Sequence, residues 1–231
     1  MDFWPALKLK PRAARLNSAF LFSQEARMRC GSGQAGRPRC TSRKADGLEW
    51  TLEGLIEAYQ ADYEDDRVKG DRWWAQAPSP EEALVRAFYD WEEGSGPPRR
   101  ILNSHQFRIG YSTVAKAAVA AERHMPRLMA AEDFDQLLAA FQTIWRIEDV
   151  FADATLLTYD VAERFGRYRN IYPAKVYLHA GAEAGARALG VEGQAPEAQA
   201  FGPALGRLPP SEIENFLCIC KSQLRPGMLG G

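Results

Sequence analysis

From Leu48 onward, the apolar residues of this 231-residue chain recur at intervals of three and four positions. Leu52, Leu55, Ile56 and Tyr59 form the first such series, and this spacing puts them on one side of an α-helix. The same period returns in later segments, and no segment is convincing as a strand. We therefore predict an all-α, compact multi-helix domain that begins near residue 48.

Two Ser-x-x-Glu boxes, each next to a proline, mark predicted helix starts. Ser79 and Glu82 form the first, and Ser211 and Glu214 form the second. A serine N-cap and a glutamate three residues later can satisfy free N–H groups at a helix start. We expect helices to begin at both boxes.

Apolar repeats predict three further helices, over 113–124, from 134 to about 145 and over 156–168. A segment rich in small residues follows from Pro173 to Leu189. Its Gly181 and Gly185 lie one turn apart and predict a face on which another helix packs closely.

Residues 1–47 differ from the rest of the chain in charge. They contain 10 of the 29 Lys and Arg residues but 3 of the 30 Asp and Glu residues, so their formal charge is +7 and that of residues 48–231 is −8. With no sustained helix or strand period, this basic leader is expected to be disordered when alone. A transit peptide, a nucleic-acid-binding arm and a translated upstream region are three interpretations that remain open.

A Gly-Ser-Gly-Pro-Pro stretch at residues 94–98 is the clearest internal boundary. The helices before it are too few for an independent core. We predict one domain over 48–231, with an N-terminal helical subdomain at 48–98 and the main helical core at 99–231.

The four cysteines do not form a Cys-x-x-Cys pair, and no secretory signal precedes them. Together with the lack of an apolar run of about 20 residues, this predicts a cytoplasmic protein without a membrane partner. The spacing of the three histidines and four cysteines favours no metal site, and no motif indicates a cofactor. Catalytic residues and oligomeric state stay unassigned, and whether the chain is an enzyme stays uncertain.

A basic cluster interrupts the acidic domain and contains Arg164, Arg167, Arg169 and Lys175. Guanidinium and ammonium groups among aromatic residues are typical of phosphate and base contacts. With Arg108, these residues support our first hypothesis, a module that binds DNA or RNA without catalysis. A solvated basic rim is the alternative.

His105 and His179 lie in largely apolar segments, where a buried polar side chain needs a partner. Tyr159 and Asp160 are the nearest companions, and with Gln106 and Tyr177 these residues are the pocket candidates. A polar pocket of a small enzyme or small-molecule binder is the second hypothesis, and a satisfied core histidine is the alternative at His105 and His179. A third hypothesis is a protein-partner module: the adjacent Trp73 and Trp74 cannot both face one helical stripe, so we expect one to be exposed.

Four motifs between residues 100 and 225 also carry a resemblance. They are H-Q-x-R, carried by His105, Gln106 and Arg108; T-x-Y-D, carried by Thr158, Tyr159 and Asp160; K-V-Y-L-H-A-G at 175–181; and E-x-F-L-C at 214–218. This half of the chain resembles a group of uncharacterised bacterial all-helical proteins. In that group the segment before T-x-Y-D is similar to the hairpin of helix-hairpin-helix DNA-binding and glycosylase folds, which implies an all-α fold and contact with DNA phosphates. Here that segment is Phe151-Ala-Asp-Ala-Thr155, without the usual glycines.

Overall fold

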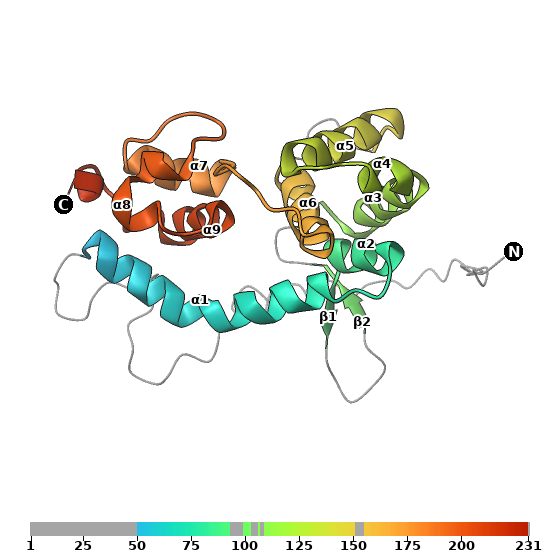
Figure 1. Ribbon diagram of the computed structural model, residues 1–231, viewed down its shortest axis with the longest axis horizontal. Helices are drawn as coiled ribbons and strands as arrows, with labels where there is room; N and C mark the ends of the chain where they lie inside the picture. The colour runs from blue at the N-terminus through green and yellow to red at the C-terminus, as the bar shows by residue number, and fades with distance from the viewer. Residues whose placement is uncertain (1–49, 93–98, 103–105, 107–108, 151–154, 231) are drawn as a thin grey trace, which may run out of the picture.

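A 24-residue helix, α1 (Leu52–Ala75), runs beneath two groups of shorter helices (Figure 1). The computed structural model describes residues 50–92, 99–102, 106, 109–150 and 155–230. The predicted leader, 1–47, and residues 151–154 of the segment compared with the helix-hairpin-helix hairpin lie outside these residues. An α-helix rises 1.5 Å per residue, so α1 is about 36 Å long and reaches both groups.

The first group of helices follows α1 directly in the chain. It comprises α2 (Pro80–Phe88), α3 (Tyr111–Arg123), α4 (Met125–Met129), α5 (Phe134–Ile147) and α6 (Thr155–Arg169). Between α2 and α3, the three-residue strand β1 (Asp90–Glu92) pairs antiparallel with β2 (Arg99–Ile101).

The second group of helices forms the C-terminal part of the chain. It comprises α7 (Ala180–Ala188), the 3₁₀ turn η1 (Ala198–Phe201), α8 (Gly202–Leu205), α9 (Pro210–Cys220) and the 3₁₀ turn η2 (Met228–Gly230). Helices account for both groups, and the predicted all-α fold class is confirmed.

Each group encloses its own hydrophobic core, and we call the two groups the first and second lobes. Phe88, Leu137, Phe141, Trp145 and Phe165 belong to the core of the first lobe. The core of the second lobe contains Leu55, Ile56, Tyr59, Phe201, Ile213, Phe216 and Leu217. The start of α1 is therefore part of the second lobe, while its later turns contact α2 and α6 of the first. This arrangement differs from the predicted division into 48–98 and 99–231, because α1 and α2 contribute to different cores.

The predicted N-cap at Ser79 is confirmed, while the Glu82 carboxylate accepts from Arg86. The Ser79 hydroxyl accepts a hydrogen bond from the N–H of Glu82 at 3.2 Å, and α2 begins at the next residue, Pro80. Asp133 caps α5 in the same way, accepting from the N–H of Gln136 at 2.8 Å.

The second predicted box is wrong, although the helix itself is present. α9 begins at Pro210, so Ser211 already has helical geometry and makes no capping bond. Ser211 and Glu214 are instead buried side chains of the helix. Because proline occupies the first helical position, the serine is two residues too late to act as the N-cap.

The small residues of α7 allow close packing against α9, as predicted. A Cβ atom at Gly185 would overlap the carbonyl oxygen of Leu217, and one at Gly181 would overlap Sγ of Cys218. In the part of the chain that is described, we find no helix with the length and apolar character needed to span a bilayer.

Candidate functional site

Helix α6 presents polar and charged side chains on one face although it is largely buried. Asp160, Glu163, Arg164 and Arg167 recur at intervals of three and four, so they line one side of the helix. The opposite side carries Ala162 and Phe165, which pack in the core of the first lobe. The polar side faces α1 and the second lobe, where it meets further charged residues.

A cavity of about 260 Å³ lies between α1, α6 and α9, and we call it the junction cavity. Its charged lining residues are Asp66, Arg67, Asp71, Asp160, Glu163, Arg164, Arg167 and Glu212. The aromatic residues Tyr59, Tyr63 and Trp74 and the α9 residues Ser211, Asn215 and Ile219 complete it. The walls therefore come from three helices that are far apart in the sequence.

Two arginines connect these walls through ion pairs. Nε of Arg167 lies 2.8 Å from a carboxylate oxygen of Asp71, and its Nη2 lies 2.9 Å from Glu163. Arg67 pairs with Asp71 at 3.1 Å and with Glu212 at 3.2 Å. Asp71 thus holds both guanidinium groups, and the network joins α1 to α6 and to α9.

Arg164 is held at the side of the first lobe. Its Nη1 donates to the carbonyl oxygen of Ala87 at 3.3 Å and lies 3.8 Å from a carboxylate oxygen of Asp90. The guanidinium also lies over the ring of Trp74, with its central carbon 5.2 Å from the ring centroid. The guanidinium of Arg164 is therefore bonded to the first lobe, and the same side chain also lines the junction cavity.

Three buried polar atoms near the cavity lack a hydrogen-bond partner among the described residues. They are Nη1 of Arg167, Nε1 of Trp74 and the hydroxyl oxygen of Tyr159. Arg167 is 8% exposed and Tyr159 is 2% exposed, so bulk water does not compensate them. An unsatisfied buried group costs about 1–3 kcal/mol, which makes this an unusual local environment.

The glutamates of this region have raised pKa values. Burial raises the pKa of Glu163, and Asp160 adds to the rise while Arg167 opposes it. Burial also raises the pKa of Glu212. For Glu214, burial raises the pKa to about 8, with further contributions from Glu163 and Asp160. Desolvation and nearby negative charge both disfavour the charged form of a carboxyl group. Groups with such shifted pKa values concentrate at functional sites.

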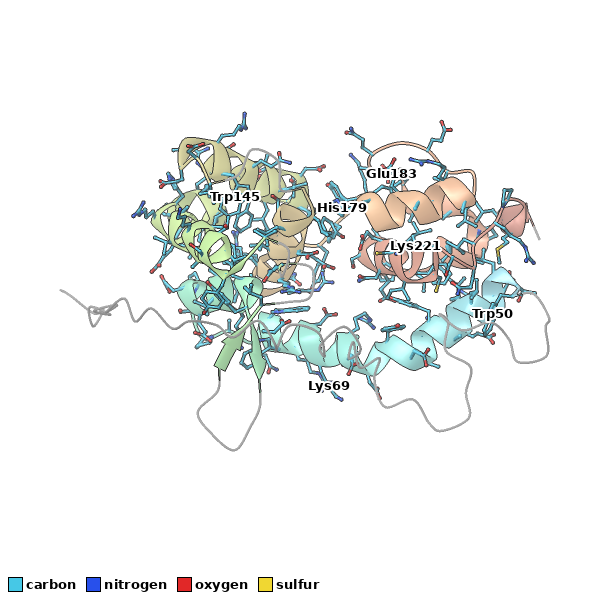
Figure 2. All side chains as sticks on the ribbon, turned by 180° about the vertical axis from the view of Figure 1, so that it is seen from behind. Trp50, Lys69, Trp145, His179, Glu183 and Lys221 are labelled. Atoms are coloured by element: carbon cyan, nitrogen blue, oxygen red, sulfur yellow. The ribbon has the colours of Figure 1, made fainter. Side chains whose placement is uncertain are left out.

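Part of the predicted polar pocket comes together in the structure. The rings of Tyr159 and His179 lie with centroids 4.6 Å apart, and those of Tyr159 and Tyr177 are 5.6 Å apart. His179 lies in the space between the two lobes (Figure 2). Asp160 lines the junction cavity.

Tyr177 and His179 line a different and larger cleft, of about 660 Å³, between α5 and the start of α7. Leu138 and Gln142 form its α5 side. The predicted pocket residues are therefore divided between this α5–α7 cleft and the junction cavity. Gln106 is fully buried and is absent from the described lining of both, while His105 lies outside the described residues.

The residues of the predicted basic cluster have separate partners. Arg164 and Arg167 are buried in the ion-pair network, and the guanidinium of Arg169 donates to the carbonyl oxygens of Leu128 and Ala131 at 2.9 and 3.1 Å. Lys175 lies 3.8 Å from Asp135. Arg108 lies outside the described residues. Arg164 and Arg167 thus differ from the solvated rim that was the alternative interpretation.

No sequence pattern identified the site residues Arg67, Asp71, Trp74, Glu212 and Glu214. Arg67 and Asp71 are four residues apart in an acidic segment that resembles an ordinary solvated helix face. The usable signal was in α9, where glutamates interrupt the apolar Ile213, Phe216 and Leu217 series. Within the described residues, no group of three or more His, Cys, Asp or Glu side chains is arranged to hold a metal ion.

Comparison of the chain with protein-family models, with curated proteins and with solved structures finds no match.

Proposed function

We propose that this protein binds a small polar molecule in the junction cavity. The observation that carries the proposal is the charged wall of this cavity: eight charged side chains from three helices surround about 260 Å³. Ligand sites are concave, lie preferentially between lobes or helices and combine apolar walls with a few polar groups. Tyr59, Tyr63 and Trp74 supply the apolar part here.

The unmatched donors support the same proposal. Arg167 and Trp74 both line the cavity, and each has one buried N–H without an acceptor among the described residues. A ligand oxygen that accepts from such a group would recover part of the free energy lost by its burial. The proposed ligand therefore carries at least one hydrogen-bond acceptor.

A thermal-shift screen of the full chain against small metabolites of positive, neutral and negative charge tests the proposal. A ligand that binds only the folded state stabilises it by about 2.7 kcal/mol at 100 times its dissociation constant. We expect at least one compound to raise the melting temperature. The Asn215→Phe variant should lose that rise, because the half-buried Asn215 lines the cavity and a phenyl ring would occupy it.

The matched control is Ser222→Phe, which adds the same ring at an exposed position two residues after α9. This variant should keep the ligand-induced rise. If the screen yields no compound, or if Asn215→Phe responds like Ser222→Phe, the junction cavity is not the binding site.

A separate proposal is nucleic-acid binding through Arg108, Arg164, Arg167, Arg169 and Lys175. The ion pairs of Arg164 and Arg167 support it less well than they support a ligand in the junction cavity. Arg164 and Arg167 would have to leave Asp90, Asp71 and Glu163 to reach a phosphate. It predicts binding of labelled DNA or RNA that weakens linearly with the logarithm of salt concentration. No binding at low salt would exclude it.

A further inference from the structure

The junction cavity carries more negative than positive formal charge. Asp66, Asp71, Asp160, Glu163 and Glu212 line it against Arg67, Arg164 and Arg167, so two negative charges remain in excess. Within the cavity, Arg67 and Arg167 pair with Asp71, Glu163 and Glu212. A bound cation would lower the electrostatic energy of these carboxylates.

Aromatic rings lie beside this excess charge. Tyr59 and Tyr63 are stacked with centroids 5.4 Å apart, and both line the cavity together with Trp74. The faces of such rings attract ammonium groups, and the attraction grows when the cation is removed from water. Arg164 already uses the Trp74 ring in this way.

A second feature of the cavity is independent of its acidic residues. Arg167 lines it, is buried, and has one N–H at Nη1 without a partner among the described residues. An ammonium group cannot satisfy that donor, whereas a hydroxyl or carbonyl oxygen can. A ligand that fits both features carries a cationic group at one end and a hydrogen-bond acceptor at the other.

We infer that the ligand of the junction cavity is a small organic ammonium compound that also carries an oxygen acceptor, as amino alcohols and amino acids do. This inference rests on the proposed function and specifies its ligand class. In the complex, the ammonium group lies near Asp160 and Glu163, and the oxygen accepts from Arg167.

Isothermal titration of the full chain with four probes of similar size tests the inference. The probes are phenylalaninol, 2-phenylethylammonium, 2-phenylethanol and phenylacetate. We expect the two ammonium probes to bind at least about tenfold more tightly than the neutral and anionic ones, and phenylalaninol to bind most tightly. Equal or tighter binding of 2-phenylethanol or phenylacetate, or no binding of any probe at millimolar concentration, would overturn the ammonium class.

Variants that remove one negative charge test where the ammonium group binds. Asp160→Asn and Glu163→Gln should each weaken phenylalaninol binding by about tenfold or more, whereas Glu183→Gln in the α5–α7 cleft should leave it unchanged. Two variants are used because Glu163→Gln also removes a partner of Arg167 and could unfold the protein. If both folded variants bind like the parent protein, the assignment is wrong.

Proton release gives a second readout. Asp160 and Glu163 help to raise the pKa of Glu214, which is about 8 in the free protein. A cation beside them would offset their negative charge and lower this pKa, so Glu214 would release a proton. Titration at pH 8 in buffers of different ionisation enthalpy should show proton release on binding, and Glu214→Gln should reduce it. Proton uptake would contradict the inference.

The two proposals can fail separately. A neutral compound that binds in the metabolite screen and is lost in Asn215→Phe, without binding by either ammonium probe, would retain the junction cavity as the site and exclude the ammonium class. Failure of the screen itself removes the site.

Discussion

Glu214 shows how burial changes the chemistry of one carboxyl group. The residue is 7% exposed and lies on α9, near the charges of Glu163 and Asp160. Its pKa rises from 4.5 to about 8 because the ionised form loses hydration and is repelled by both neighbours. At neutral pH the group therefore holds a proton that an exposed glutamate would have lost.

The stability of the protein should fall as the pH rises through this range. Between pH 4.5 and 8 the folded state binds more protons at Glu214 than the unfolded state does, so the free energy of unfolding decreases with pH. Glu214→Gln should be nearly neutral at pH 4.5 and should stabilise the protein at pH 9 by about 2–5 kcal/mol. Urea denaturation at both pH values measures this difference.

The control for this comparison is Glu183→Gln, which changes an exposed carboxylate of α7. Its effect should be small and nearly the same at both pH values. An effect of Glu214→Gln that does not grow with pH would show that the carboxyl group is ionised in the folded protein.

Helix boundaries depend on where a capping side chain lies relative to the first turn. Ser79 precedes the first residue of α2 and accepts from the N–H of Glu82, whereas Ser211 follows the first residue of α9. The hydroxyl of Ser211 instead accepts from Nη2 of Arg167 at 3.4 Å. The serine of the same four-residue pattern thus caps a helix in one place and lines the junction cavity in the other.

Alanine substitutions should separate these roles. Ser79→Ala should lower the free energy of unfolding by about 1 kcal/mol, the usual contribution of an N-cap. Ser211→Ala removes only one long hydrogen bond and should cost less than about 0.5 kcal/mol. Chemical denaturation of the two variants checks this, and equal costs would contradict the assignment of Ser79, but not Ser211, as an N-cap.

The whole molecule consists of two lobes with separate cores that share α1. Direct polar contacts of α9 with α1 and α6 include the ion pair of Arg67 with Glu212 and the hydrogen bond of Arg167 with Ser211. The buried apolar residues fall in two separate cores, and the junction cavity between α1, α6 and α9 is largely charged. The second lobe can therefore open locally while the first lobe stays folded.

Hydrogen exchange of Phe216→Ala tests this independence. Phe216 is fully buried in the second lobe and packs edge-on against Tyr59 with ring centroids 5.6 Å apart, so its truncation should cost about 3–5 kcal/mol. Amides of α7 and α9 should exchange faster, while those of α3 and α5 keep their protection. Equal acceleration in α3 would mean that the two lobes unfold as one unit.

The sequence predicted the helical elements because their signals are local. The three- and four-residue spacing of Leu55, Ile56 and Tyr59 and the cap at Ser79 involve residues within a few positions of one another. The close packing at Gly185 could also be predicted, since two small residues one turn apart permit it wherever the partner helix lies. Trp73 is the exposed member of its pair, as expected, and Trp74 is half-buried.

The candidate site could be predicted only in part. His179 is a candidate because a polar group in an apolar segment needs a partner, with Tyr159 and Asp160 as its companions, and ring contacts join His179 and Tyr177 to Tyr159. Arg167 is a candidate from its charge, which gives no information on whether the group is solvated or paired. Only the fold brings it 2.8 Å from Asp71, a residue 96 positions earlier in the chain.

Fold class and helix positions thus follow from short-range periodicity and capping in this chain, whereas the junction cavity depends on long-range packing. Asp71, Glu163, Arg167 and Glu212 become one charged site because α1 spans both lobes and holds α6 and α9 on either side of the cavity. Burial of Glu214 on α9, with Glu163 and Asp160 nearby, also raises the pKa of this carboxyl group. Charge and hydration at such a site depend on neighbours distant in sequence, so no local pattern could specify them.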